Sequence, residues 1–144
     1  YEVCRFLATE IVRGGEGATK LVTVQVTGAR TYDEAKQAAR AIANSLLVKT
    51  AIHGGDPNWG RLVAVAGRAG VDFDLQNAAV RIGDIVLFEG GRPFDERAPQ
   101  AAAYLKAKDI SVSVDLGTGG SDEATMWTCD LSKEYVQINA EYRT

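Results

Sequence analysis

His53 is the only histidine of the chain, and it opens a segment, HGGDPNWGRL at 53–62, that is rich in side chains able to do chemistry. An imidazole serves as a general acid or base only when a nucleophile or an orienting carboxylate lies within reach. The sequence offers no Gly-X-Ser-X-Gly elbow and no Cys–His spacing that would supply one. We therefore expect His53 to be structural, at a helix end, with a turn at Asp-Pro-Asn, Trp59 in the core, and Arg61 on a carboxylate or a helix end.

The glycine-rich stretch GGEGATK at 14–20 is a second candidate site. A phosphate-binding Walker A loop has Gly directly before Lys and lies between a strand and a helix. Here Thr19 precedes Lys20 and a strand pattern follows, so the stretch is better explained as a helix-to-strand connection in which glycines adopt positive φ. Glu16 stands between two glycines, and its carboxylate could instead bind an ammonium group. Both interpretations of Glu16 stay open on the pattern alone.

Asn139 and Thr144 lie at the end of the sequence. One interpretation is a frayed tail. The alternation in YVQINAEY at 135–142 instead predicts a strand that ties the tail down and could bring its polar groups close to a pocket.

The composition indicates one compact domain over residues 1–144 and excludes several classes of protein. The chain is 46% hydrophobic and 24% charged, with a net charge of −3 and a pI near 5.2. A nucleic-acid binder needs a basic face, and a membrane span needs about 18 consecutive apolar residues; neither is present. With one histidine and two scattered cysteines, we expect no metal site, and no signal peptide is visible.

The periodicity of apolar residues predicts the elements that must position these candidates. Helices are expected over 2–13, over 31–47 behind a Thr31–Glu34 capping box, and from Asp95 to about 107. Strands are expected at 20–28, 62–67, 80–88, 92–95 and 135–142, and at 110–114 and 124–131 as a hairpin closed by the loop 117–122. The predicted fold class is therefore α+β, a sandwich of helices on a largely antiparallel sheet.

Three segments taken together resemble one family. GEGATK at 15–20, VKTAIHGGDPNWGR at 48–61 and INAEYRT at 138–144 are similar to the C-terminal part of the β chain of the ornithine acetyltransferases, the glutamate N-acetyltransferases of the ArgJ family. The resemblance covers essentially the whole chain, in order and with matching spacing. It implies a DmpA/ArgJ-like fold, which resembles that of the N-terminal nucleophile hydrolases.

The resemblance also implies a reaction. Members of the family cut themselves before a threonine, which then carries an acetyl group from N-acetylornithine to glutamate in arginine biosynthesis. An adjacent amine can activate such a hydroxyl, and preorganised donors stabilise the oxyanion. No cofactor is implied, although bifunctional members use acetyl-CoA as a donor. The implied compartment is the cytoplasm of a bacterium, or the mitochondrion of a fungus or alga.

Carried over position by position, the family's substrate-binding residues fall on Glu16, Asn139 and Thr144. The first residue is Tyr1 and not the family's threonine nucleophile, which we expect upstream, so the resemblance implies no catalytic residue within this chain, which alone should be inactive. The implied partners are the two amino-acid substrates, the α chain and the N-terminal part of the β chain, in a hetero-oligomer without nucleic acid or membrane. His53 receives no catalytic role, and its segment would shape a wall of the site.

Three other functions fit parts of the pattern. A small-molecule-binding or regulatory module would explain the glycine loops without chemistry, and would bind an amino acid tightly. An assembly domain would bury the alanine-rich helix against a partner and form oligomers without ligand. An aminopeptidase of the DmpA type would hydrolyse peptide amides without transfer to glutamate.

Overall fold

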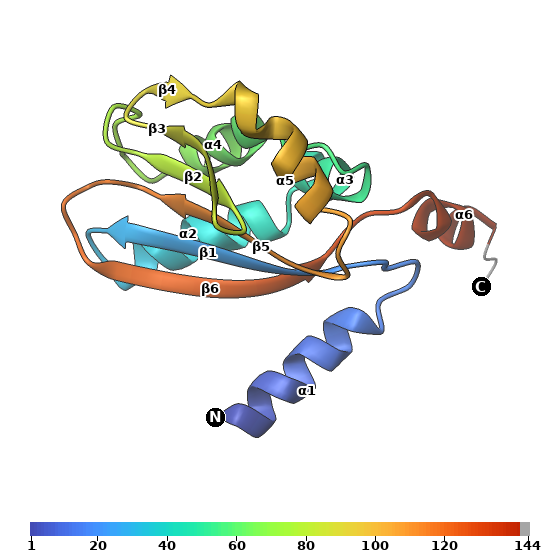
Figure 1. Cartoon of the computed structure of the whole chain (residues 1–144). Helices are drawn as coiled ribbons and strands as arrows, with labels where there is room; N and C mark the ends of the chain where they lie inside the picture. The colour runs from blue at the N-terminus through green and yellow to red at the C-terminus, as the bar shows by residue number, and fades with distance from the viewer. Residues whose placement is uncertain (142–144) are drawn as a thin grey trace.

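One mixed β-sheet organises the chain in the computed structural model, which describes residues 1–141 (Figure 1). Within these residues the sheet has six strands in the order β4-β3-β2-β5-β1-β6. The strands are β1 (Leu21–Ala29), β2 (Ala79–Ile82), β3 (Ile85–Glu89), β4 (Arg92–Pro93), β5 (Asp109–Asp115) and β6 (Asp122–Cys129). Neighbouring strands run antiparallel except for β1 and β5, which are parallel. The α+β class and the largely antiparallel sheet are thus confirmed.

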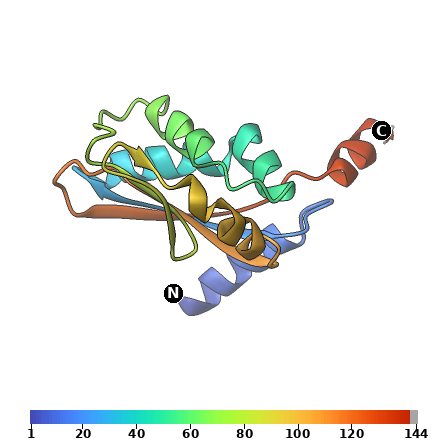
Figure 2. The same ribbon diagram turned by 45° about the horizontal axis from the view of Figure 1, so that its top comes forward.

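Helices lie against this sheet and beyond its end (Figures 1 and 2). They are α1 (Glu2–Arg13), α2 (Tyr32–Ala43), α3 (Leu46–His53), α4 (Trp59–Gly67), a 3-10 turn η1 (Asp95–Arg97), α5 (Ala98–Tyr104) and α6 (Lys133–Glu141). In Figure 1, α2 covers one face of β1 and β6, α1 lies on the other side of these strands, and α6 projects beyond the end of β6. In residues 1–141 no helix has the length and apolar character that crossing a bilayer requires.

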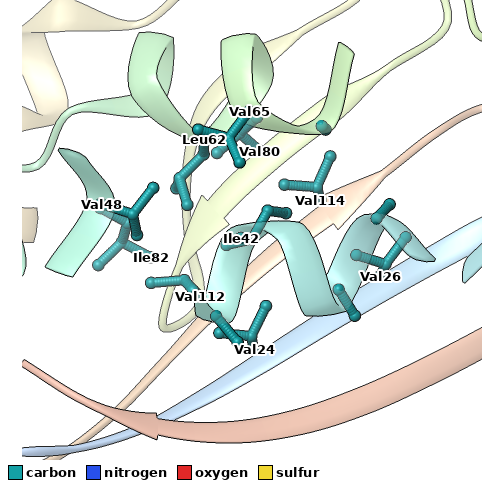
Figure 3. Packing of buried hydrophobic residues seen from close by; sticks show 14 of the residues in the cluster. Val24, Val26, Ile42, Val48, Leu62, Val65, Val80, Ile82, Val112 and Val114 are labelled. Atoms are coloured by element: carbon teal, nitrogen blue, oxygen red, sulfur yellow. The ribbon is translucent and has the colours of Figure 1, made fainter. Parts of the chain in front are cut away.

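The hydrophobic core lies between the sheet and helices α2, α3 and α4 (Figure 3). On β1 the alternation is regular: Val22, Val24 and Val26 are at most 1% exposed, whereas the residues between them are half-buried. Ile42 of α2 is fully buried over this valine row. The buried side chains recur at every second residue on the strand and at every third or fourth residue on the helix. These are the spacings by which each element turns one apolar face to the other.

The capping box at the start of α2 is confirmed. The Thr31 hydroxyl accepts the backbone N–H of Glu34 at 3.2 Å, and the Glu34 carboxylate reaches back to the N–H of Arg30, one residue earlier than expected, also at 3.2 Å. The single helix predicted over 31–47 is wrong, however. Helix α2 ends at Ala43, and the buried Ser45 caps a separate helix, α3, by accepting the N–H of Val48.

Residues 62–67 form part of helix α4, not the predicted strand. The Asn58 side chain accepts the N–H of Arg61 at 3.0 Å and caps the helix. Leu62, Val65 and Ala66 are the buried members, at helical spacing. A short apolar run reads equally well as strand or helix, and here the cap decides.

The predicted hairpin between 110–114 and 124–131 is also wrong. Strands β5 and β6 exist, but β1 lies between them and pairs with both. The loop at 117–122 passes over the end of β1, where Thr118 donates both its backbone N–H and its hydroxyl to the Gly28 carbonyl. Alternation predicts a strand but does not say which strand lies beside it.

The predicted elements between residues 80 and 107 and at 135–142 also differ from the structure. The predicted strand at 80–88 is two strands, β2 and β3, separated by a turn in which Gly83 has a φ of 57°. The turn at Gly90–Gly91 is confirmed, but the strand expected at 92–95 is only β4, which ends at Pro93. The helix expected from Asp95 to about 107 is η1 followed by α5, which ends at Tyr104 and has proline in its first turn. The strand expected at 135–142 is wrong, because 133–141 form helix α6 and Val136 and Ile138 are exposed.

The core at Ile42 leads to a stability prediction. We expect Ile42→Ala to lower the free energy of unfolding by about 2–5 kcal/mol, because it leaves a cavity between α2 and the sheet. Leu46→Ala is the control, since Leu46 is 65% exposed, and it should cost less than about 0.5 kcal/mol. Urea unfolding of the chain measures both, and equal effects would contradict the assigned packing.

Candidate functional site

The loop between α1 and β1 lies against the start of α6. Gly17 has a φ of 64°, and a Cβ there would stand 2.5 Å from the backbone nitrogen of Tyr135. The buried Ser132 hydroxyl donates to the Gly17 carbonyl at 2.6 Å and accepts the N–H of Tyr135 at 3.0 Å. The predicted helix-to-strand connection with a positive-φ glycine is thus confirmed, and it touches a helix that the sequence pattern did not predict.

Glu16 and Asn139 meet across this contact, although they are 123 residues apart in the sequence. The Asn139 side-chain N–H₂ donates to Oε2 of Glu16 at 3.1 Å and to the Tyr135 carbonyl at 2.9 Å. Both side chains are exposed. An exposed carboxylate beside an amide can bind a ligand ammonium group, the carboxylate through charge and the amide through its oxygen. Thr144, the third predicted residue, lies outside the described residues.

A buried carboxylate contacts the same loop three and four residues after Glu16. Asp130 directly follows β6, and its side chain is fully inaccessible to solvent. Its Oδ1 accepts the backbone N–H groups of Thr19 at 2.8 Å and Lys20 at 2.9 Å. Its Oδ2 lies 2.5 Å from the Thr19 hydroxyl and 2.7 Å from Nδ1 of His53. Asp130 therefore joins the glycine loop, the end of β6 and the end of α3.

These contacts keep Asp130 ionised. Burial by itself raises the pKa of Asp130, but hydrogen bonds from the Thr19 hydroxyl, His53 and the two backbone N–H groups lower it more. The resulting pKa lies below the usual value of 3.8. A buried carboxylate is stable only when donors surround it in this way.

His53 is the last residue of α3, as expected for a structural histidine at a helix end. Its partner Asp130, however, was missed by the sequence analysis. The only available signal was an aspartate directly after an apolar strand, and nothing in a separation of 77 residues links the two.

Lys20, the last residue of the GATK segment, binds the ends of two helices. Its ammonium donates to the carbonyls of Ile52 at 3.0 Å and Leu105 at 2.7 Å. These carbonyls lie at the C-terminal ends of α3 and α5, where a cation offsets the helix dipole. Lys20 therefore has a structural position, consistent with the rejection of a nucleotide-binding loop.

Trp59 and Arg61 of the segment DPNWGR contact other parts of the fold. Trp59 is partly buried, and its ring stacks on Phe88 with centroids 4.7 Å apart. Arg61 donates to the Leu47 carbonyl at 2.7 Å, in the first turn of α3, so of its two predicted roles it fulfils the contact with a helix end.

Comparison with known proteins identifies the family. The profile of the ArgJ family matches residues 1–144. The chain belongs to the ArgJ family. Arginine biosynthesis bifunctional protein ArgJ of Synechocystis is 48% identical, over 99% of this chain and 36% of the relative. Glutamate N-acetyltransferase of Methanopyrus kandleri is 51% identical, over 99% of this chain and 38% of the relative.

The crystal structure of arginine biosynthesis bifunctional protein ArgJ from Bacillus halodurans has the same fold. It superposes with a TM-score of 0.92 at 43% identity, and the match covers 98% of this chain and 66% of that one. The chain spans a little over a third of the length of the two curated relatives. Membership establishes the family and the fold, and the substrate-binding roles of Glu16 and Asn139 stay predictions.

The lowered pKa of Asp130 leads to a prediction about pH. Asp130 is ionised more readily in the folded chain than in the unfolded chain, so its contribution to stability is complete above about pH 4 and is lost as the pH falls through the lower folded pKa. We expect Asp130→Asn to reduce the free energy of unfolding by about 1–3 kcal/mol at pH 6, and this deficit to shrink below pH 3.8.

Urea unfolding of both chains between pH 6 and pH 3 measures this difference. Asp115→Asn is the control, because Asp115 is exposed and accepts only a local turn N–H at 2.9 Å among the described contacts. A deficit of Asp130→Asn that stays constant across this range would contradict the ionised, hydrogen-bonded carboxylate.

Proposed function

We propose that this chain is part of a glutamate N-acetyltransferase that moves an acetyl group from N-acetylornithine to glutamate. The family membership supports the reaction, and the names of two curated relatives, a bifunctional arginine biosynthesis protein and a glutamate N-acetyltransferase, agree with it. The contact of Glu16 with Asn139 is the observation that carries the assignment to this surface.

In this proposal the reaction has two halves. A threonine oxygen forms an ester bond to the acetyl carbon, the bond from that carbon to the ornithine nitrogen breaks, and the nitrogen takes up a proton. The glutamate amine then attacks the ester, the carbon–oxygen bond breaks, and the threonine hydroxyl is restored. The threonine and the oxyanion donors belong to other parts of the complete protein, which we propose as the partners of this chain.

Glu16 and Asn139 bind the amino-acid substrate in this proposal. N-acetylornithine carries a side-chain amino group that takes no part in the reaction, and this ammonium group replaces the amide N–H₂ of Asn139 as donor to Glu16. The released amide, together with Thr144, can then hydrogen-bond the polar ends of the substrate. No cofactor is needed, and acetyl-CoA would enter only as an alternative acetyl donor.

Substitution of Glu16 tests the assignment. In the gene product that carries this chain, we expect Glu16→Ala to lower kcat/KM for acetyl transfer about 10- to 100-fold, as loss of one charge-assisted hydrogen bond predicts. The measurement follows N-acetylglutamate formed from N-acetylornithine and glutamate without acetyl-CoA. Glu134→Ala, a change of an exposed glutamate in the first turn of α6, is the matched control and should retain activity.

Other outcomes point to other functions. Equal transfer by Glu16→Ala and the wild type would return Glu16 to a structural role in the loop. Hydrolysis of peptide amides without transfer would favour the aminopeptidase. Tight amino-acid binding without turnover would favour a binding module, and ligand-independent oligomers without either would favour an assembly domain.

The 144-residue chain alone provides a second test. Incubated with N-acetylornithine and glutamate, it should form no N-acetylglutamate, because the proposed nucleophile belongs to another part of the protein. Sustained turnover by the purified chain, measured by chromatography of the products, would place the nucleophile within these residues and contradict the proposal.

A further inference from the structure

The connection between β6 and α6 forms hydrogen bonds with the glycine-rich loop at 14–20 through two residues. Asp130 accepts the backbone N–H groups of Thr19 and Lys20, and Ser132 donates to the Gly17 carbonyl. The same connection leads directly into α6, which carries Asn139. These contacts therefore connect the residues that follow Glu16 to the segment that leads to Asn139.

We propose that Asp130 is a positioning residue, which holds the Glu16 loop at the distance from Asn139 that recognition of a substrate ammonium group needs. The proposal rests on the proposed substrate-binding role of Glu16. Asp130 itself is buried and touches no substrate, so it acts through the backbone at Thr19 and Lys20.

The division of contacts between its two oxygens makes Asp130 suited to this role. Oδ1 accepts two consecutive backbone N–H groups, which fixes two successive peptide planes, Ala18–Thr19 and Thr19–Lys20. Oδ2 contacts only side chains among the described hydrogen bonds, the Thr19 hydroxyl and His53. Removal of the carboxylate would leave the two N–H groups without their acceptor, and the loop would shift to find another.

This division also predicts which substitution preserves the geometry. In Asp130→Asn the amide oxygen can take the place of Oδ1 and keep both backbone contacts. The amide N–H₂ then stands at Oδ2, where the Thr19 hydroxyl oxygen and a His53 Nδ1 without a proton can each accept a hydrogen bond. Asp130→Ala offers none of these contacts.

Steady-state kinetics of the complete gene product test the proposal. At pH 8, we expect Asp130→Ala to raise KM for N-acetylornithine, whose side-chain ammonium group does not react, at least about tenfold while kcat falls less than about threefold, because binding rather than chemistry is affected. Asp130→Asn should keep KM within about twofold of the wild type despite its lower stability. Asp115→Ala is the control, because Asp115 lies at the end of β5 that is away from the loop at 14–20, and it should leave KM unchanged.

A double substitution separates positioning from a general loss of structure. If Asp130 acts through Glu16, then Asp130→Ala should add less than about a twofold change in KM to the Glu16→Ala protein. Effects that multiply fully, or a KM of Asp130→Asn as high as that of Asp130→Ala, would overturn the proposal. If Glu16→Ala raises KM but Asp130→Ala has the KM of the wild type, the proposal for Asp130 is also overturned. If Glu16→Ala itself leaves KM unchanged, the proposed role of Glu16 fails instead.

Discussion

A buried negative charge at Asp130 is the constraint on which the arrangement of this end of the molecule depends. Its side chain is fully inaccessible, yet it receives donors from the loop at Thr19 and Lys20 and from His53 of α3. A buried carboxylate left without its donors costs at least about 1–3 kcal/mol, so the surrounding segments are held in one arrangement. The carboxylate therefore defines where three distant parts of the chain must meet.

The consequences of this constraint extend outward to the surface. Lys20, placed by Asp130, in turn binds the terminal carbonyls of Ile52 and Leu105 through its ammonium group. On the other side of the loop, Gly17 approaches the start of α6 so closely that a side chain would not fit. Glu16 then lies at the surface beside Asn139. The glycine-rich loop at 14–20 is thus fixed by hydrogen bonds to its backbone, and the exposed carboxylate of Glu16 has a defined position.

The sequence predicts elements well where one local interaction decides them. The valine row of β1 and the Thr31 cap are both local, and both are confirmed. The errors arise where the deciding partner is remote or a cap outweighs a pattern. The Asn58 cap makes 62–67 helical, the Ser132 cap makes 135–141 helical, and the insertion of β1 between β5 and β6 is invisible in the alternation of either strand.

The candidate site shows the same division. Glu16 and Asn139 were found through resemblance to a family, because neither pattern nor spacing relates two residues at opposite ends of the chain. Asp130 was not found, since a single aspartate after a strand is an ordinary feature until the fold brings His53 and Thr19 to it. Sequence reasoning thus named two exposed groups of the candidate site and missed the buried Asp130, whose contacts only the fold brings together.

The most direct measurement of the central claim is the titration of Asp130 itself. Carbon-13 NMR of the labelled chain can follow its carboxyl carbon between pH 7 and pH 2, with Asp130→Asn used to assign the signal. The account predicts that the pKa of Asp130 lies below 3.8, because the hydrogen bonds stabilise the ionised form more than burial opposes it. A pKa at or above that value would mean that these donors do not hold a buried charge, and would contradict the account.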